Sequence, residues 1–184
     1  MDLVLETGRL ILRRFVAADI DRLFSLHNDP EVMRFLTGGE PISRAEIERD
    51  YRQRFANDGY WAAVERASGA FVGWFALHPT PERDPAEFEL GYRLRKEFWG
   101  NGYAAEGSRA LIGNAFAARG ARRIWAQTMA VHRASRRVME KSGLKYVRTF
   151  HLAFDDPLPG TELGEVEYAL DRADWERRQP DLLP

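Results

Sequence analysis

The hydrophobic residues of the chain recur with two different periods. In residues 88–94 every second residue is apolar, so that Phe88, Leu90, Tyr92 and Leu94 would share one face of a half-buried strand. Shorter apolar segments between turn residues predict six more strands, at residues 9–15, 60–65, 71–77, 122–129, 144–152 and 165–170. Residues 78–85 hold three prolines, and we expect them to form an exposed loop.

Apolar residues at helical spacing predict helices between these strands. Asp19 is a natural N-cap, and Ser43 with Glu46 forms a capping box. The predicted helices lie at residues 19–27, from Pro30 on, 44–57, 103–119, 134–142 and from about residue 171 on. Strands dominate early and alternate with helices later. This order predicts an α/β (α+β) fold with a mixed sheet of about six or seven strands flanked by helices.

The composition is that of a globular protein. The chain has 184 residues, of which 45% are hydrophobic and 30% charged. We expect a single domain over residues 1–184, with a short terminal helix or tail from about residue 171. No apolar run approaches the ~20 residues of a membrane span, and the first 15 residues lack the features of a signal peptide. The expected location is therefore cytoplasmic, away from a membrane.

Residue types that are absent exclude several functions. The chain has no cysteine, which excludes a disulfide scaffold, a thiolate zinc site and a Cys nucleophile. None of its four histidines is spaced with a second ligand as in a metal site, so no metal is expected. Because the net charge is −1, the chain has no overall positive electrostatic field that would attract a polyanion, and we expect no bulk nucleic-acid binding.

The near-neutral total hides two oppositely charged segments. In residues 119–148 Glu140 is the only acid among many basic residues, whereas in residues 155–176 Arg172 is the only base among many acids. Two interpretations stay open. The segments are solvated faces that attract each other, or the first binds an anionic ligand and the second a cationic one.

The strongest local signal is the junction at residues 94–104, where the alternating strand meets a helix through Gly100 and Gly102. Glycines permit positive φ and close approach of a ligand, and the free N–H groups of a first helical turn attract a phosphate. The segment also fits a dinucleotide fingerprint, but the strand that follows offers no acid for a ribose. A P-loop is excluded because no Lys-Ser/Thr follows the glycines. A helix start without a ligand remains the alternative.

Three segments of the chain resemble N-acetyltransferases of the GNAT superfamily, of the RimJ/RimL type. Residues 6–13 (ETGRLILR) resemble the opening strand of that family. Residues 89–92 (ELGY) with 99–104 (WGNGYA) resemble its acetyl-CoA motif, and residues 134–144 (ASRRVMEKSGL) resemble the motif that follows. The resemblance implies a GNAT-like splayed sheet, acetyl-CoA as co-substrate and an amine as acceptor. It leaves open whether the protein is a homodimer.

The resemblance also implies which residues bind the co-substrate. Backbone groups of Tyr92, Arg93 and Leu94 would pair with the pantetheine arm between two diverging strands. The pyrophosphate would be held by the backbone of Trp99, Gly100, Asn101, Gly102, Tyr103 and Ala104. The remaining members of the cofactor-binding set would be His132, Ser135 and Arg137.

Three positions depart from the family pattern. Glu97 stands where the family often has Gln or Arg, and we expect its carboxylate to turn outward. His132 replaces a usual Asn; it donates one hydrogen bond but titrates near neutral pH, so a lower or pH-dependent cofactor affinity is expected. Met139 stands where many relatives carry a Tyr acid, and it cannot transfer a proton.

Acetyl transfer to an amine requires a base for the ammonium group and a stabilised leaving thiolate. Glu89 matches a glutamate that many family members use as a base, usually through water; the alternative is an exposed carboxylate on the polar face of its strand. Ser135 matches a serine that some RimL-like members place near the sulfur; the alternative is a helix N-cap. A chain without cysteine agrees with direct transfer.

The sequence therefore predicts an acetyl-CoA-dependent N-acetyltransferase that acts on a primary amine, either a protein N-terminus or a small molecule. One alternative is a non-catalytic acyl-CoA-binding regulatory module, which His132 and Met139 keep open. Another is an acyltransferase for a larger group, such as succinyl from succinyl-CoA. The acidic turn at residues 155–162 would suit a cationic acceptor, or it is a solvated loop.

Overall fold

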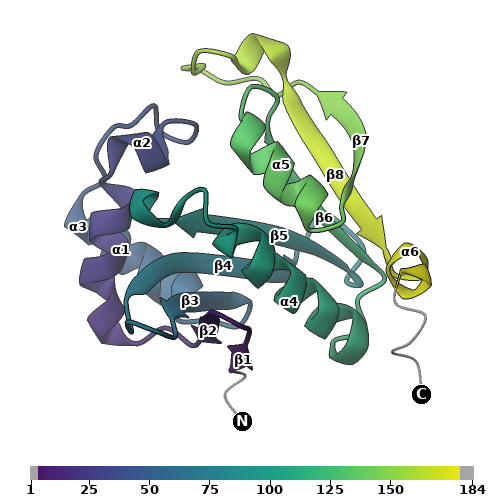
Figure 1. Cartoon of the computed structure of the whole chain (residues 1–184). Coiled ribbons are helices and arrows are strands. Elements are labelled where there is room, and N and C mark those ends of the chain that lie inside the picture. Colours follow the sequence, from purple (N-terminus) through teal and green to yellow (C-terminus); the bar gives the residue numbers. More distant parts are fainter. Residues whose placement is uncertain (1–3, 179–184) are drawn as a thin grey trace.

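A computed structural model gives the structure of residues 4–178, and all strands of this part belong to one sheet. The strands are β1 (Leu5–Glu6), β2 (Leu10–Arg13), β3 (Tyr60–Glu65), β4 (Phe71–Pro79), β5 (Glu87–Leu94), β6 (Arg123–Met129), β7 (Lys145–Phe150) and β8 (Glu165–Asp171). Their spatial order is β1-β2-β3-β4-β5-β6-β8-β7 (Figure 1). The α/β fold class is confirmed, but the sheet has eight strands. The strand missed by the sequence is β1, which is too short to show a period.

The sheet opens at one point. Neighbouring strands are antiparallel except β5 and β6, which run parallel. Their pairing ends at Glu89 and Trp125, although β5 continues to Leu94 and β6 to Met129. Beyond this pair the two strands diverge, and Figure 1 shows the two halves of the sheet separating there. The splayed sheet implied by the family resemblance is confirmed.

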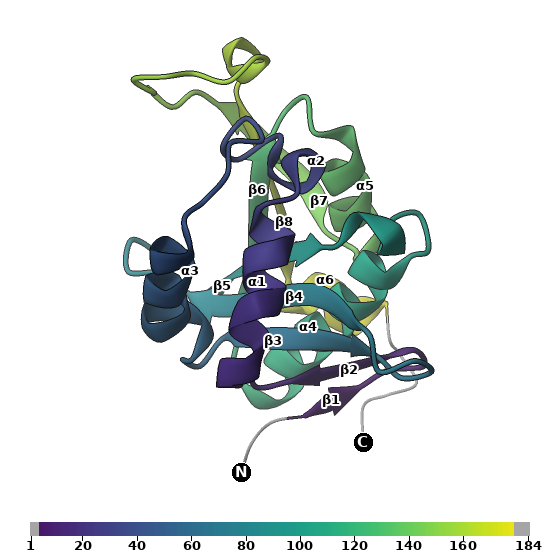
Figure 2. The same ribbon diagram turned by 90° about the vertical axis from the view of Figure 1, so that its left-hand side faces the viewer.

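Helices cover both faces of the sheet. They are α1 (Ile20–His27), α2 (Pro30–Met33), α3 (Arg44–Asp50), α4 (Tyr103–Ala118), α5 (Arg133–Lys141) and α6 (Arg172–Arg177). A π-helical segment, η2 (Tyr51–Phe55), continues α3. Figure 2 shows α1 and α3 together on the side of the sheet that faces away from α4.

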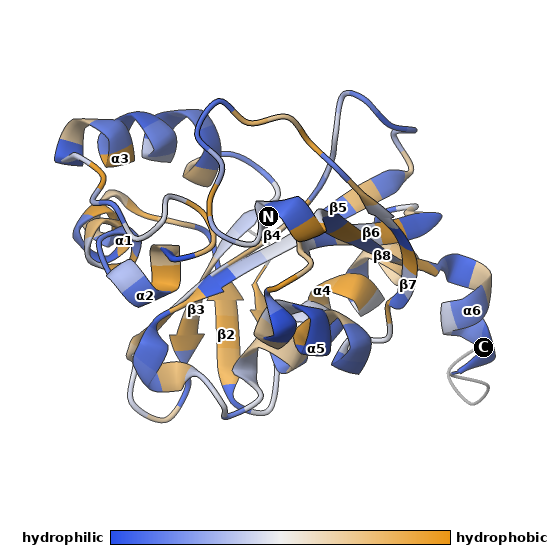
Figure 3. Ribbon diagram, turned by 90° about the horizontal axis from the view of Figure 1, so that it is seen from above, coloured by the Kyte–Doolittle hydropathy of each residue, from blue (hydrophilic) through white to orange (hydrophobic). Residues whose placement is uncertain are grey.

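Alternation along the strands divides the core into two clusters. Even-numbered residues of β5, such as Phe88 and Leu90, pack in the cluster under α4. On the other face, Tyr60 and Trp74 pack in the cluster under α1 and α3 with Phe55. In Figure 3, β2 is coloured mainly as hydrophobic and α5 mainly as hydrophilic. Each face of the sheet is thus buried by its own helices.

Strand β4 is longer than predicted. The expected loop at residues 78–85 is wrong for its first two residues, because His78 and Pro79 pair with Glu89 and Phe88 of β5. A proline is tolerated here because its nitrogen faces the β3 side, beyond the point where β3 pairs with β4. The consequence is that His78 lies beside Glu89, opposite it in the sheet.

Asp19 is the N-cap residue of α1, as predicted, but its side chain makes no capping hydrogen bond. Its fully buried carboxylate accepts hydrogen bonds from Arg13 at 2.7 and 2.9 Å, from Arg22 at 2.8 Å and from the backbone N–H of Val16 at 3.0 Å. A short 3₁₀ turn, Ala17–Asp19, precedes the helix and brings the carboxylate under β2 instead. The capping box of Ser43 and Glu46 is confirmed.

Candidate active site

Beyond Glu89, where β5 diverges from β6, backbone groups on one edge of β5 point away from β4 and into the opening. The N–H of Arg95 donates to Val72 of β4 at 2.9 Å, and a Cβ added to Gly73 of β4 would lie 2.2 Å from the carbonyl oxygen of Arg93. The backbone N–H and C=O groups of alternate strand residues point to opposite neighbouring strands, so those of Tyr92 and Leu94 point toward the β6 side. Of the three residues predicted to pair with the pantetheine arm, Arg93 instead has its backbone groups on β4. Tyr92 and Leu94 are the two whose backbone groups point into the opening.

The loop after β5 adopts the glycine conformations that the sequence indicates. Gly100 has φ 76° and Gly102 has φ 82°, and both lie in the left-handed region that favours glycine. Gly102 is the N-cap of α4, without a side-chain cap, and its carbonyl accepts the first helical bond, from Glu106 at 3.0 Å. The backbone N–H groups that come before Glu106 in the first turn, beginning with that of Tyr103, therefore do not donate within the helix. They form an anion-binding end of the helix.

Side chains around this loop hold it in place. Arg9 donates to the carbonyl of Asn101 at 2.9 Å, forms an ion pair with Glu106 at 2.6 Å and lies 4.4 Å from the ring centre of Tyr103. The indole of Trp99 donates to the carbonyl of Leu94 at 2.8 Å. Arg9 was not among the predicted site residues, because 92 positions separate it from Asn101 and no local pattern links them.

The remaining residues of the predicted loop show mixed exposure. Gly100, Asn101 and Gly102 are exposed, Ala104 is half-buried, and Tyr103 is buried with its hydroxyl donating to Glu65. Glu97 is exposed and pairs with Arg95 at 3.0 Å, which agrees with its expected outward position. The exposed backbone is therefore concentrated at the two glycines.

Tyr92 joins β5 to α5 on the α4 side of the opening. Its hydroxyl lies 3.0 Å from both the carbonyl oxygen and the Oγ of Ser135. Burial raises the pKa of Tyr92, so the phenol stays protonated and acts as a donor. Ser135 lies in the first turn of α5, whose N-cap is His132, so the alternative of Ser135 as the N-cap is wrong.

His132 and Arg137, also predicted to bind cofactor, have different environments. The imidazole of His132 stacks on Phe35 with ring centres 4.2 Å apart, and burial lowers its pKa. Arg137 is exposed on α5 and forms no hydrogen bond or ion pair within residues 4–178. Its neighbour Arg136 donates to Tyr168 and Ala130 and serves the packing of α5.

Glu89 lies at the apex of the opening, on the face covered by α1 and α3. Burial raises the pKa of its carboxyl group, Glu82 adds to the rise, and the charges of Arg83 and Arg54 oppose it. Its cross-strand neighbour is His78, whose Nδ1 donates to the carbonyl of Pro79 at 3.2 Å. A half-buried carboxyl with a raised pKa has the property required of a general base.

A chain of hydrogen bonds continues from His78 away from Glu89. Because Nδ1 of His78 carries the proton, Nε2 accepts from the hydroxyl of Tyr60 at 3.1 Å. Tyr60 in turn accepts from Arg54 at 3.1 and 3.4 Å. Burial lowers the pKa of His78, which keeps the imidazole neutral within this series of hydrogen bonds.

Two buried polar groups on this face were missed by the sequence analysis. The indole N–H of Trp125, whose residue pairs with Glu89, has no hydrogen-bond partner within residues 4–178. Glu165 at the start of β8 is buried, and burial raises its pKa. Its neighbour on the same face, Glu167, is bound by Arg83 at 2.8 Å and Arg148 at 2.9 Å. Only the pairing of the strands shows that these groups share the face of Glu89.

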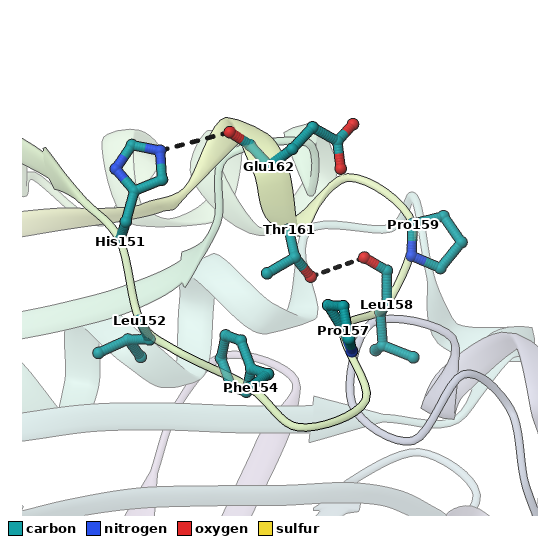
Figure 4. Close-up of a pocket in the computed structure, with 8 residues that line it drawn as sticks. All are labelled: His151, Leu152, Phe154, Pro157, Leu158, Pro159, Thr161 and Glu162. Atoms are coloured by element: carbon teal, nitrogen blue, oxygen red, sulfur yellow. Dashed lines mark hydrogen bonds between the residues drawn. The ribbon is translucent and has the colours of Figure 1, made fainter.

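The loop that connects β7 and β8, which includes the acidic turn, forms a separate pocket of about 500 Å³ (Figure 4). Its lining is largely apolar and comprises His151, Leu152, Phe154, Pro157, Leu158, Pro159, Thr161 and Glu162. The carboxylate of Glu162 accepts from the backbone N–H of Gly160 at 2.9 Å. The predicted acidic surface for a cationic acceptor therefore supplies one acid to this pocket, and that acid is already hydrogen-bonded.

Within residues 4–178, no three His, Cys, Asp or Glu side chains gather where they could hold a metal ion. In the same described part, no helix has both the length and the apolar character that crossing a membrane requires.

A family comparison agrees with this geometry. Residues 9–145 match the model of the acetyltransferase (GNAT) domain, a match that includes the glycine loop, the opening at Glu89 and α5. The chain belongs to the GNAT family of acetyltransferases.

Curated relatives of this GNAT chain support the assignment. A protein of Aspergillus fumigatus named FsC-acetyl coenzyme A-N(2)-transacetylase is 36% identical over 185 residues, which cover 95% of this chain and 79% of the relative. The uncharacterized protein YkkB of Bacillus subtilis is 33% identical over 150 residues, or 79% of this chain and 87% of the relative.

Solved structures share the fold of this GNAT chain. A GNAT-family acetyltransferase from Bacillus anthracis has a TM-score of 0.79 at 20% identity and covers 93% of this chain and 99% of its own. A spermidine N-acetyltransferase from Vibrio cholerae, in complex with CoA and spermine, has a TM-score of 0.76 at 15% identity. The match covers 92% of this chain and 99% of the Vibrio chain. At these identities the likeness concerns the fold.

Proposed function

We propose that this chain transfers an acetyl group directly from acetyl-CoA to a primary amine. The observation that carries the proposal is the opening of the sheet at Glu89, with free backbone on one side and a carboxyl of raised pKa at its apex. The name of the Aspergillus relative, which specifies acetyl coenzyme A and a nitrogen, N(2), supports this reaction.

The residues present fit a CoA ester. Tyr92 and Leu94 direct backbone groups to the opening, where an extended pantetheine arm would pair as an added strand. Gly100 and Gly102 leave the start of α4 open to a pyrophosphate, and a Cβ at Gly100 would meet no atom within 4 Å. In this proposal Arg9 holds the loop rather than the phosphate, because Glu106 already neutralises its charge.

The chain's own residues divide the proton transfers between the two faces of β5. Glu89 takes a proton from the ammonium group of the acceptor, directly or through one water, and the neutral amine that results is the nucleophile. On the opposite face the Tyr92–Ser135 pair donates a hydrogen bond to the leaving thiolate. No acyl-enzyme intermediate is needed, because the amine attacks the thioester carbon while both are bound.

An assay of thiol release from acetyl-CoA by the purified protein, across a panel of amines, tests the proposal. Turnover that depends on the amine, with the acetylated amine as product, is expected. Succinyl-CoA in the same assay tests the preference for a larger acyl group. Failure to bind acetyl-CoA would contradict the whole assignment.

One alternative is a non-catalytic acyl-CoA-binding module. It is favoured by Met139, which is buried in the core, and by His132, which is stacked on Phe35, because neither supplies a proton to the thiolate. Tight acetyl-CoA binding without turnover of any amine would select this alternative. The RimJ/RimL-like subtype, a single domain over residues 1–184, the cytoplasmic location, the absence of nucleic-acid binding and a homodimer all stay predictions.

A further inference from the structure

The face of the sheet that carries Glu89 has a regular pattern of side chains. On β5 the residues of this face are Glu87, Glu89, Gly91 and Arg93, and the partners of the last three on β4 are His78, Ala76 and Trp74. Two larger pairs thus flank the small pair of Ala76 and Gly91. A Cβ added to Gly91 would lie 3.6 Å from Ala76 and from the ring of Trp74, so the indole of Trp74 borders this small pair.

Arg93 stands at the far end of this row without an acidic partner. Its guanidinium carbon lies 5.2 Å from the ring centre of Trp74, and its side chain forms no ion pair or hydrogen bond within residues 4–178. Burial and, to a lesser extent, the charge of Arg54 lower the pKa of Arg93 to about 10. The positive charge of Arg93 is therefore partly desolvated and left uncompensated by a contact.

Arg54, an exposed residue of η2, adds a second positive charge that acts on Arg93. Its only hydrogen bonds within the described residues go to the neutral hydroxyl of Tyr60, and no carboxylate lies in ion-pair contact with it. The charges of Arg54 and Arg93 also lower the pKa of the buried His27 to about 3, after the larger effect of burial. His27 is thus neutral, accepting from the indole of Trp74 at 3.2 Å.

A third hydrogen-bond donor on this face also lacks a carboxylate partner. Besides the two guanidinium groups, the indole N–H of Trp125 is buried without a partner among residues 4–178, one strand away from Glu89. The nearby acids weaken this positive field, since Asp50 acts on Arg93 and Glu89 acts on Arg54, but within residues 4–178 neither acid forms an ion pair with an arginine of this face. A ligand that brings anionic oxygen atoms would satisfy the unpaired donors.

We propose that Arg93 and Arg54 bind a carboxylate of the acceptor, so that the substrate is an amine carrying an anionic oxygen group rather than a polycation. This inference rests on the proposed N-acetyltransferase function, with the amine at Glu89. Polyamines are disfavoured by the same two positive charges.

The distance between Glu89 and Arg93 limits how far apart the amine and the carboxylate of the acceptor can be. Glu89 and Arg93 are four residues apart on β5, which separates their backbones by roughly 13 Å. The charged end of an arginine lies several ångströms from its backbone, and that of Arg93 lies beside the ring of Trp74, which also borders Gly91 in the middle of the row. The amine and the carboxylate of the acceptor should therefore be separated by a few bonds, as in amino acids.

Matched pairs of amines test this inference. The acceptors are glycine, β-alanine, 4-aminobutyrate and 6-aminohexanoate, each compared with its amide, and spermine as the polycation. We expect the acid of the fitting length to exceed its amide by about 10-fold or more in kcat/KM, the effect of one charge-assisted bond. Amines are compared at equal concentrations of the free base, because their pKa values differ.

Variants of the arginines test whether these residues cause the preference for an acid over its amide. Arg93→Met keeps the stem over Trp74 and should reduce the ratio of acid to amide to about one, while Arg93→Lys should restore part of it. The matched control is Arg52→Met, which removes an exposed arginine from the same π-helical segment as Arg54. Arg52→Met should leave the ratio, and the KM for acetyl-CoA, unchanged.

The outcomes separate this inference from the proposed function. Turnover of spermine above all acids, or equal rates with acids and amides, overturns the carboxylate site while leaving the N-acetyltransferase intact. If no amine is acetylated although acetyl-CoA binds, the proposed function fails. Calorimetry of 4-aminobutyrate and its N-acetyl product with the CoA complex then decides the site. Binding that Arg93→Met leaves unchanged, or no binding at all, overturns it.

Discussion

The hydroxyl of Tyr92 lies 3.0 Å from the Oγ of Ser135, so that a side chain of β5 and one of α5 meet across the opening of the sheet. If the phenol left this contact, a buried polar group would lose its hydrogen-bond partner. Tyr92 therefore positions the serine hydroxyl, and it does so from the face opposite Glu89.

Replacement of Tyr92 by Phe should lower kcat by about 10-fold, since it removes one hydrogen bond that orients the group at the thiolate. The KM for acetyl-CoA should change little. Steady-state rates of Tyr92→Phe, Ser135→Ala and the double variant check this, because residues that act together give non-additive losses. Tyr146→Phe, which removes an exposed hydroxyl from β7, is the control. Fully additive losses would show that the two hydroxyls act independently.

Replacement of Glu89 by Gln should lower kcat by ~10²–10⁴-fold with little change in acetyl-CoA affinity, because a general base is lost. Only the carboxylate accepts a proton, and burial raises the pKa of Glu89. In the wild type, kcat/KM should therefore fall as the pH drops through that raised pKa. The variant should lack this limb of the pH profile.

A second buried carboxyl provides the comparison for Glu89. Burial also raises the pKa of Glu165, which lies on the same face at the start of β8. If Glu165→Gln removes the acidic limb and Glu89→Gln does not, the base has been assigned to the wrong residue.

Replacement of Gly102 by Trp should weaken acetyl-CoA binding by at least 10-fold. The residue has φ 82° at the N-cap of α4, and a large side chain there would cover the N–H groups of the first turn. Gly120→Trp is a matched control, because Gly120 has φ 71° and open space around it at the other end of the same helix. Titration of acetyl-CoA by calorimetry measures both. Equal affinities would place the pyrophosphate elsewhere.

Features with a local cause were predictable from the sequence. The alternation in residues 88–94 gave β5 and its inward face, and Gly100 with Gly102 marked a loop in which both residues have positive φ. The capping box at Ser43 gave the start of α3. In each case a few neighbouring residues determine the backbone, so a short window of sequence contains the information.

Contacts between distant segments were not predictable. Arg9 and Asn101 meet because β2 lies beside the start of α4, and Tyr92 reaches Ser135 because β5 diverges from β6. Asp19 occupies the predicted N-cap position, yet Arg13 and Arg22 compete successfully for its carboxylate. The charges on the face of Glu89 likewise come from separate segments, because Arg93 lies on β5 and Arg54 on η2.

Replacement of Asp19 by Asn should destabilise the fold by about 3 kcal/mol, because it leaves Arg13 beside a neutral group in a buried site. Asp21→Asn, whose carboxylate pairs with Arg44 at the surface, should cost less than about 1 kcal/mol. Although burial raises the pKa of Asp19, hydrogen bonds from Arg13 and Val16 lower it overall. The stabilisation is therefore present above the pKa of the unfolded chain and is lost as the pH falls through the lower folded value. Urea unfolding of wild type and Asp19→Asn should converge in midpoint at acidic pH; a constant difference down to pH ~2 would contradict the buried ion pair.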